Sequence, residues 1–282
     1  MAILMDGKTL AKTIKSEVKE QADNLRKKGI EPHLAIVLAG DDPASAVYVK
    51  NKISDCVECG LIGTTYHLPA DTAQDELMIQ IARLNADQAI HGILLQHPYP
   101  QGVDDFAVRS AIDPLKDVDS LNPYNTGLIA SDRPHFLPGT PAGIMALLDK
   151  YEISIKGKHC VIINRTHIVG KPMAQMMLLR DATVTVCHSR TPDIMMFTRT
   201  ADILITAVGK IGLITGNMIK PGAVVIDVGI SKKSDGKLAG DVVFEEAEPV
   251  ASYITPVPGG VGPMTRAILM KNTVTAAVEA TI

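Results

Sequence analysis

The first hundred residues show two spacings of apolar positions. Over residues 8–28, apolar side chains recur every three or four positions among charged ones, which predicts an amphipathic helix ending at Gly29. Continuous apolar runs instead predict buried strands at 33–39, 61–68 and 90–96. Helices are expected between them, from Asp42-Pro43 to about Cys59 and over 75–84. This alternation favours a parallel sheet with helices on its faces.

The second half repeats the alternation after a proline-rich stretch. Residues 112–141 contain five prolines and predict a loop-rich boundary between two folding units. A helix is expected over 142–150, and the predicted strands are 159–164, 183–187, 203–208 and 223–228. A rigid loop at 256–263 precedes a final helix from Thr265. The expected division is residues 1–140, with helix 265–282 packing back on them, and residues 141–264.

Composition and charge limit the kinds of molecule that the protein is expected to bind. The 282 residues are 46% hydrophobic and 21% charged, which suits two packed α/β domains. A net charge of −3 does not favour binding to nucleic acid, and the apolar run at 201–208 is too short for a membrane span. No signal peptide is apparent at the first residues, so we expect a cytoplasmic protein. Cys56 and Cys59 lack a second ligand pair, which favours packing over a metal site.

The turn at 164–172 carries the signal for a cofactor. It joins a predicted strand to a helix that has Pro172 in its first turn, and a helix N-terminus in this place favours phosphate. The Gly-x-Gly-x-x-Gly pattern is absent. The next predicted strand ends in Cys-His-Ser-Arg without the acid that usually holds the ribose of NAD. Arg165, Ser189 and Arg190 therefore point to the extra phosphate of NADP, although a solvated basic turn is the alternative.

Other residues of the expected cofactor site follow from their place at strand ends. Asn164 and Thr166 belong to the first turn, while Gly209 and Ile230 follow the later strands, where the nicotinamide half is expected. Gly209 alone is equally consistent with an ordinary strand-ending turn.

Lys52 lies four residues after Tyr48 on the predicted second helix, so both side chains project from one face. An isolated helical lysine is usually solvated. Gln96 ends the third predicted strand directly before a proline-rich turn, where parallel sheets meet their ligands. These positions alone leave a structural and a functional interpretation open.

Four features of the sequence, taken together, are specific enough to indicate a known family. They are Tyr48-x-x-x-Lys52, Gln96 at a strand end, Lys116-Asp117-Val118-Asp119, and the string Pro-Val-Pro-Gly-Gly-Val-Gly-Pro-Met-Thr at 256–265. With Asp6-Gly7-Lys8 and the turn at 164–172, the chain resembles the bifunctional methylenetetrahydrofolate dehydrogenase/methenyltetrahydrofolate cyclohydrolase family. The resemblance implies oxidation of 5,10-methylenetetrahydrofolate by NADP and hydrolysis of the methenyl product to 10-formyltetrahydrofolate, in two α/β domains with an active-site cleft between them.

The resemblance also implies residue roles. Lys52 would manage protons during hydrolysis, Gln96 would orient Lys52 or water, and Tyr48 would wall the folate site. Asp119 would bind the pterin through two parallel hydrogen bonds, while Asp117 supports its loop. Gly260 and Pro263 are expected in the substrate site. Hydride transfer needs alignment rather than a strong base. We also expect a homodimer.

Several positions depart from the family pattern. His97 and Tyr99 replace two leucines of Gln-Leu-Pro-Leu-Pro, Ser120 and Asn164 replace glycines, and Gly139 replaces a cysteine. Asn164 puts a side chain where backbone should approach phosphate. The changes at His97 and Tyr99 leave open a dehydrogenase without hydrolase activity. Two more distant alternatives are a shikimate-dehydrogenase-like reductase and a non-catalytic nucleotide-binding module.

Overall fold

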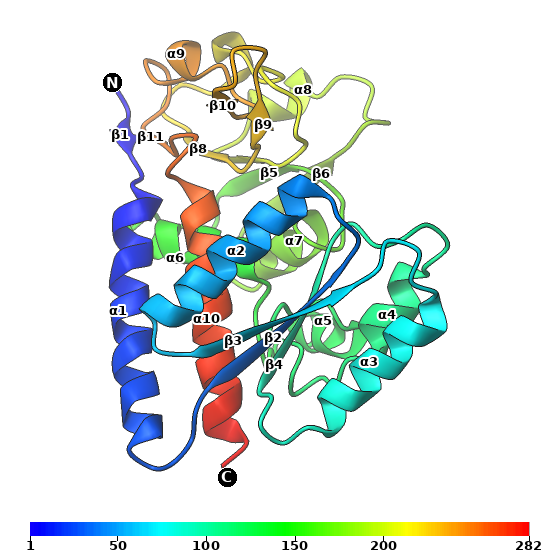
Figure 1. Cartoon of the computed structure of the whole chain (residues 1–282). Helices are drawn as coiled ribbons and strands as arrows, with labels where there is room; N and C mark the ends of the chain where they lie inside the picture. Colours follow the sequence, from blue (N-terminus) through cyan, green and yellow to red (C-terminus); the bar gives the residue numbers. More distant parts are fainter. Residues whose placement is uncertain (282) are drawn as a thin grey trace. The chain divides into compact units, whose positions relative to one another are not determined.

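The computed structural model describes residues 1–281 and divides the chain into two compact units (Figure 1). The six-stranded unit comprises residues 1–11 and 140–265, and the three-stranded unit comprises residues 12–139 and the chain from Arg266 onward. The first eleven residues thus lie outside the unit in which the sequence placed them. The reason is that β1 (Ile3–Leu4) pairs in parallel with β11 (Tyr253–Ile254) of the other sheet.

The three-stranded unit is a parallel sheet in the order β3-β2-β4, with β2 in the middle. Its strands are β2 (His33–Ala39), β3 (Ile62–Leu68) and β4 (Gly92–Gln96). Its helices are α1 (Gly7–Arg26, whose first turn belongs to the other unit), α2 (Pro43–Glu58), α3 (Gln74–Ala86), α4 (Asp105–Ala111) and α5 (Pro123–Ala130). The predicted strand–helix order is confirmed.

Helices cover both faces of this sheet because the side chains of β2 alternate between two cores. Leu34, Ile36 and Leu38 pack with buried residues of α1, α2 and the last helix, α10 (Val261–Glu279). Ala35 and Val37 pack on the opposite face with α3 and α4. The apolar stripe of α1 and the carboxyl-terminal part of α10 therefore contribute to the core of this unit.

The stretch 112–141 was predicted to be rich in loops, but it contains helical structure. α5 begins at Pro123, with Asn122 as its N-cap, and α6 (Gly139–Lys150) begins three residues before the predicted helix start. Proline at a first helical position is compatible with a helix, because its missing N–H has no intrahelical partner there. α10 likewise begins at Val261, four residues earlier than predicted.

The six-stranded unit has an all-parallel sheet in the order β1-β11-β8-β7-β5-β6. Its remaining strands are β5 (His159–Ile163), β6 (Thr183–Cys187), β7 (Ile203–Thr206) and β8 (Val224–Asp227). Short elements complete it: α7 (Gly170–Leu178), α8 (Met195–Thr198), the 3₁₀ turn η1 (Gly216–Met218), α9 (Phe244–Ala247) and a ladder of β9 (Ser231–Lys232) with β10 (Leu238–Ala239). No helix over residues 1–281 has the length and hydropathy of a membrane span.

Candidate active site

Lys52 is carried by α2, whose start is fixed by its cap. Asp42 is the N-cap, and its carboxylate accepts hydrogen bonds from the backbone N–H and the hydroxyl of Ser45, at 2.8 and 2.7 Å. Tyr48 and Lys52 follow this cap on the same helix and are separated by about one turn. Lys52 is half-buried, whereas the Tyr48 side chain is 50% exposed. The helix therefore presents an aromatic ring at the surface and a sheltered amine beside it.

Gln96, the last residue of β4, forms a hydrogen bond with Lys52. The Lys52 ammonium donates a hydrogen bond of 2.8 Å to Gln96 Oε1. Gln96 Nε2 donates to the carbonyl of His97 at 2.7 Å, and the Ser45 hydroxyl donates to the same carbonyl at 3.1 Å. Because a carbonyl oxygen only accepts, this contact assigns which end of the amide is nitrogen and turns Oε1 toward Lys52.

The surroundings of Lys52 favour its neutral amine. Burial lowers its pKa, the nearby charge of Arg266 on α10 lowers it further, and the charge of Asp119 opposes both. A lowered pKa raises the fraction of lysine that can accept a proton near neutral pH. The interaction with Arg266 was not predicted, because it joins residues distant in the chain.

Arg266 is itself held by α2. Its guanidinium lies 3.0 Å from Asp55 Oδ2, and Lys15 of α1 forms an ion pair with the other oxygen of this buried carboxylate. Asp55 stands three residues after Lys52. It therefore fixes the cation that acts on Lys52, a role for which the sequence offered no motif.

Asp119 lies in a loop stabilised by its neighbour Asp117. The Asp117 carboxylate accepts hydrogen bonds from the backbone of Leu121 and Asn122, at 3.2 and 2.8 Å, and from the amide of Asn125 at 2.8 Å. Burial raises the pKa of Asp117 to about 6. The expected supporting position of Asp117 thus agrees with its contacts.

Ser120 follows Asp119 with a φ of 57°, in the left-handed region where glycine is at ease. This conformation explains why a glycine was expected at the position. The serine hydroxyl donates to the carbonyl of Phe136 at 3.0 Å, a contact that glycine cannot make. The backbone path of the loop is therefore kept with a different residue.

The expected cofactor residues follow the carboxyl ends of adjacent parallel strands. Ile163 at the end of β5 is in register with Cys187 of β6 and Thr206 of β7, and Thr206 is in register with Asp227 of β8. Strand β5 lies between β6 and β7, so the chain crosses over at this point of the sheet. Such switch points are where open parallel sheets bind ligands.

Asn164 is the first residue beyond β5, and its side chain is turned into the protein. Its Oδ1 accepts hydrogen bonds from the N–H and hydroxyl of Thr166, both at 2.8 Å, and from the N–H of Gly170 at 2.9 Å. Its Nδ2 donates to the carbonyl of Ala207. The side chain is 91% buried by these contacts, so it shapes the turn and does not project from it as the sequence suggested.

The first N–H groups of α7 are also satisfied within the protein. Besides Gly170, Lys171 N–H donates to the Thr166 carbonyl at 2.9 Å and Val169 N–H to the Thr166 hydroxyl at 3.2 Å. These three N–H groups are therefore not free to bind a phosphate, although the sequence favoured a phosphate at this helix start. Arg165 and Thr166 are both exposed, but the Thr166 hydroxyl is bonded within the turn, so Arg165 is the one of these two whose polar group has no contact in the turn among the described bonds.

The turn after β6 exposes the other two predicted residues. Ser189 and Arg190 are exposed, while the turn is closed by hydrogen bonds from His188 N–H to the Thr191 hydroxyl, 3.0 Å, and from Arg190 N–H to His188 Nδ1, 3.1 Å. Beyond β6 there is no carboxylate until Asp193. Arginine and hydroxyl side chains without an acid suit a phosphate monoester.

Two buried aspartates organise the turns that carry Gly209 and Ile230. Asp241 accepts hydrogen bonds from the Thr206 hydroxyl and from Val208 and Lys210 N–H, between 2.7 and 2.9 Å. Asp227 accepts from three backbone N–H groups at 2.9–3.0 Å, and burial raises its pKa to about 6. Asp241 was not identified from the sequence, where it follows a short polar hairpin without a recognisable motif.

Gly260 and Pro263 belong to the six-stranded unit, where the closing loop contacts the first residues of the chain. The Lys8 N–H donates to the Gly259 carbonyl at 3.0 Å, and a Cβ on Gly7 would lie 1.8 Å from the Gly260 carbonyl oxygen. Glycine at position 7 is therefore required by close backbone approach. This contact explains physically why Asp6-Gly7-Lys8 accompanies the closing string.

Cys56 and Cys59 are fully buried thiols, and burial raises the pKa of each to about 12. Thiolate is therefore scarce at neutral pH, and thiolate is the reactive and metal-binding form. Both residues belong to the core shared by α1, α2 and α10, as the packing interpretation required.

These features define a two-unit α/β protein with a dinucleotide-type parallel sheet and a separate lysine–glutamine site. Residues 138–281 match the NAD(P)-binding domain of tetrahydrofolate dehydrogenase/cyclohydrolase, and residues 5–119 match its catalytic domain. The chain belongs to the tetrahydrofolate dehydrogenase/cyclohydrolase family, as the resemblance indicated.

Relatives of similar length support this membership. The bifunctional protein FolD of Moorella thermoacetica is 54% identical, over 98% of this chain and 99% of its own. The FolD crystal structure from Campylobacter jejuni has a TM-score of 0.98 at 48% identity and covers 99% of both chains. The Trypanosoma brucei enzyme, complexed with NADP cofactor and inhibitor, has a TM-score of 0.94 at 40% identity and covers 99% of this chain and 98% of its own.

Proposed function

We propose that this chain oxidises 5,10-methylenetetrahydrofolate with NADP and hydrolyses the methenyl product to 10-formyltetrahydrofolate. Membership in the bifunctional family, over nearly the whole chain, supports both reactions. The observation that carries the hydrolase is the hydrogen bond between Lys52 and Gln96, because it joins a lysine of lowered pKa to a strand end.

For the first reaction, NADP supplies the hydride acceptor. The residues described beyond β5 and β6 fit its phosphorylated ribose, because Arg165, Ser189 and Arg190 are exposed and the turn after β6 lacks an acid. Asn164 supports the turn from within, while Gly209 and Ile230 stand on turns fixed by Asp241 and Asp227. The contribution of these residues is alignment, and no strong base is needed.

For the second reaction, water adds to the methenyl carbon and a proton must be removed as the ring opens. Lys52 accepts and returns that proton, for which its lowered pKa suits it. Gln96 holds the amine through Oε1. The hydroxyl and ring of Tyr48, one turn away on α2, are available to the same substrate.

Folate binding is assigned to Asp119, Gly260 and Pro263, and each is described in its own surroundings. Asp119 offers two carboxylate oxygens, which match the adjacent 2-amino and ring N–H groups of a pterin. Gly260 and Pro263 stand in the loop that contacts Gly7. We further infer a cytoplasmic homodimer. Its ligands are small molecules and not nucleic acid, because a net charge of −3 does not favour binding to a phosphate backbone.

Two absorbance assays test the two reactions separately. Purified protein with NADP and 5,10-methylenetetrahydrofolate should generate methenyl absorbance, and added methenyltetrahydrofolate should decay faster than in buffer. Formation without accelerated decay would leave a dehydrogenase alone. Failure of both assays would remove the proposal.

Changing Lys52 to Met should separate the activities, because only hydrolysis needs proton transfer through this side chain. We expect hydrolysis to fall by roughly 100-fold or more and hydride transfer by less than about tenfold. Lys50→Met, at an exposed position of the same helix, is the matched control and should alter neither rate by more than about twofold. An equal loss of both activities in Lys52→Met would contradict the role.

A further inference from the structure

Asp119 is carried by a short turn that its neighbours close. The Ser120 N–H donates to the Asp117 carbonyl at 2.9 Å, which makes Asp119 a central residue of a β-turn. The Asp117 carboxylate accepts hydrogen bonds from the N–H groups of the two residues that follow Ser120. The place of Asp119 is therefore set by bonds that the residues around it make.

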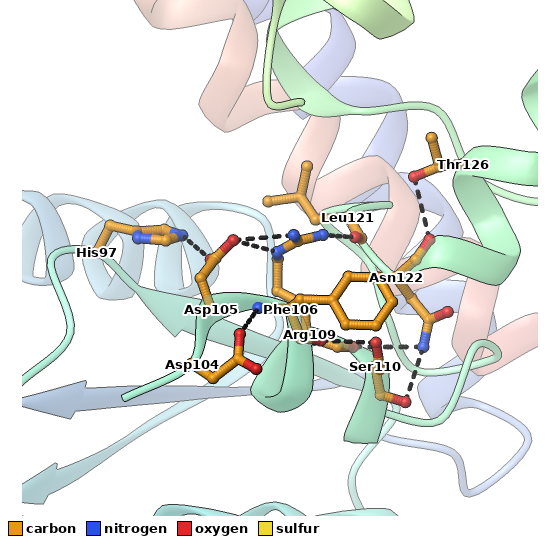
Figure 2. A network of polar contacts seen from close by, with 9 residues as sticks. All are labelled: His97, Asp104, Asp105, Phe106, Arg109, Ser110, Leu121, Asn122 and Thr126. Carbon is orange, nitrogen blue, oxygen red and sulfur yellow. Dashed lines mark hydrogen bonds and ion pairs between the residues drawn. The ribbon is translucent and has the colours of Figure 1, made fainter. Parts of the chain in front are cut away.

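Arg109, in the last turn of α4, holds the far side of this loop. Its Nη1 donates a hydrogen bond of 2.6 Å to the carbonyl of Leu121, two residues after Asp119. Its Nε and Nη2 donate to Asp105 Oδ2 at 3.0 and 2.9 Å (Figure 2). Because Asp117 accepts from the Leu121 N–H, Leu121 is held at both of its backbone polar groups.

Burial makes the contact between Arg109 and Leu121 difficult to replace. Arg109 is 91% buried, and Leu121 is buried as well. A buried carbonyl that loses its donor destabilises the protein unless it finds another partner. Without the guanidinium, the Leu121 carbonyl must move to reach a new donor, and the loop moves with it.

α4 is itself held at both ends. At its carboxyl end, Asn122 Nδ2 donates to the Ile112 carbonyl at 2.8 Å, while the Asn122 N–H is bonded within the loop. At its first turn, Asp105 Oδ1 lies 3.6 Å from Nε2 of His97, the first residue after β4 (Figure 2). The guanidinium therefore acts on the loop from a helix whose own position is fixed.

Ser120 makes the turn depend on such support. Its φ of 57° lies in the left-handed region, which a residue with a Cβ keeps only when surrounding contacts fix the backbone. The Ser120 hydroxyl supplies one contact, to the Phe136 carbonyl, and Arg109 supplies another at the next residue. Loss of the Arg109 contact would thus allow the turn to relax away from this conformation.

We propose that Arg109 is a positioning residue for Asp119: anchored on Asp105, its guanidinium holds the Leu121 carbonyl and so keeps both carboxylate oxygens of Asp119 aligned with the pterin. The inference rests on the proposed function, in which Asp119 binds the pterin. It gives a purpose to a buried arginine that no sequence motif identified.

The effect should fall on binding and not on the chemical step. Two parallel hydrogen bonds require a carboxylate placed to within about 0.5 Å, so a displaced Asp119 binds the pterin more weakly. The pterin N–H groups that Asp119 faces are not part of the one-carbon bridge that reacts. An Arg109 variant should therefore lose affinity for folate with little change of rate at saturation.

Arg109→Met tests this expectation, because methionine keeps much of the apolar stem and removes the donors. Measured by calorimetry, tetrahydrofolate should bind about tenfold more weakly than to wild type. Hydrolysis at saturating methenyltetrahydrofolate should stay within about threefold of wild type, and NADP affinity within about twofold. A loss of rate at saturation as large as the loss of affinity would contradict the positioning role.

Val108→Ala is the matched control for a general loosening of α4. Val108 precedes Arg109 and is fully buried in the core that α4 shares with α3. Its truncation should lower the stability measured by urea unfolding, as Arg109→Met does, but tetrahydrofolate affinity should stay within about twofold of wild type.

A double variant tests whether Arg109 acts through Asp119. The comparison uses kcat/KM for hydrolysis, which stays measurable when binding is weak. Asp119→Ala should lower kcat/KM by itself, and adding Arg109→Met should lower it by less than about twofold more. The reason is that the loop then carries no carboxylate to displace.

Asp105→Asn provides a further arm, and it carries the test if Arg109→Met does not fold. The guanidinium loses its charged anchor, so tetrahydrofolate should bind about threefold more weakly. Asp104→Asn is its control, because Asp104 caps α4 by accepting the Phe106 N–H at 2.9 Å, as asparagine also can (Figure 2). This control should bind as wild type does.

Four results would overturn the proposal: unchanged tetrahydrofolate affinity in Arg109→Met, an equal loss of affinity in Val108→Ala, a further tenfold loss of kcat/KM in the double variant, or equal affinities in the two single aspartate variants. Failure of the proposed function is recognised separately. In that case wild type itself binds no tetrahydrofolate, and this inference falls with it.

Discussion

At the scale of single residues, the turn after β5 depends on the side-chain amide of Asn164, whose direction the sequence could not reveal. Asn164 stands where a glycine was expected, and its polarity suggested a side chain facing the cofactor. Its amide instead bonds inward to Thr166, Gly170 and Ala207. Ala207 lies 43 residues farther along the chain, so the inward orientation requires the register of β5 and β7.

Asn164→Ala should therefore weaken both the fold and the proposed NADP site. It leaves buried donors without an acceptor, for which we expect a loss of roughly 2–4 kcal/mol in the free energy of unfolding. We also expect about tenfold weaker NADP binding, because the turn loosens. Urea unfolding and calorimetric titration measure the two effects. Asn24→Ala, exposed on α1, should change stability by less than about 0.5 kcal/mol, and comparable losses at both positions would contradict this account.

The lysine site shows the same limit of sequence reasoning. The spacing of Tyr48 and Lys52 and the place of Gln96 left a structural and a functional interpretation open until the family resemblance assigned the site. The structure brings Lys52 and Gln96 into contact. Arg266 and Asp55 were missed. Their interaction joins α10 to α2, and no local pattern encodes such a long-range ion pair.

At the scale of elements, most long helices and strands were predictable because their periodicity is strong. β2 and β6 have the predicted bounds, and α2 begins after the predicted cap. α5 was missed although Asn122-Pro123 repeats the cap signal of Asp42-Pro43, because the density of prolines suggested a loop. Two-residue strands such as β1 and β11 are too short to have a period, and they exist only through their neighbours.

The start of α7 offers a test of element packing. A Cβ on Gly170 would lie 2.1 Å from the Asn164 carbonyl oxygen, so Gly170→Ala must displace the turn. We expect unfolding to become easier by roughly 3 kcal/mol. The same change at Gly127, an exposed position of α5 with open space around it, should instead stabilise by about 0.5–1 kcal/mol. Thermal unfolding of the two variants compares them, and equal effects would refute the packing explanation.

At the scale of the whole molecule, buried titratable groups should shape stability with opposite signs. Burial raises the pKa of Asp117 and Asp227 to about 6 from 3.8, so the native state binds more protons between these values and stability falls as pH rises through them. Burial lowers the pKa of His33 and His91. The unfolded chain binds more protons there, so stability falls as pH drops below about 6.5.

His91 allows the histidine contribution to be isolated. It is 92% buried, and the charges of His33 and Lys116 add to the lowering of its pKa by burial. His91→Gln should therefore lose less unfolding free energy than wild type between pH 7.5 and pH 5. Urea unfolding at several pH values measures the slope. Parallel curves for wild type and variant would show that His91 does not carry this dependence.

The buried aspartates of the six-stranded unit affect how its turns respond to ionic strength. Asp227 and Asp241 accept hydrogen bonds from backbone N–H groups and a threonine hydroxyl, with no lysine or arginine contact among the described bonds. Salt screens ion pairs between exposed side chains far more than buried hydrogen bonds. The turns bearing Gly209 and Ile230 should consequently keep their shape in concentrated salt, whereas the partly exposed pair of His97 and Asp105 should weaken. Concentrated salt would thus weaken the contact of His97 with Asp105 before it disturbed the turns that carry Gly209 and Ile230.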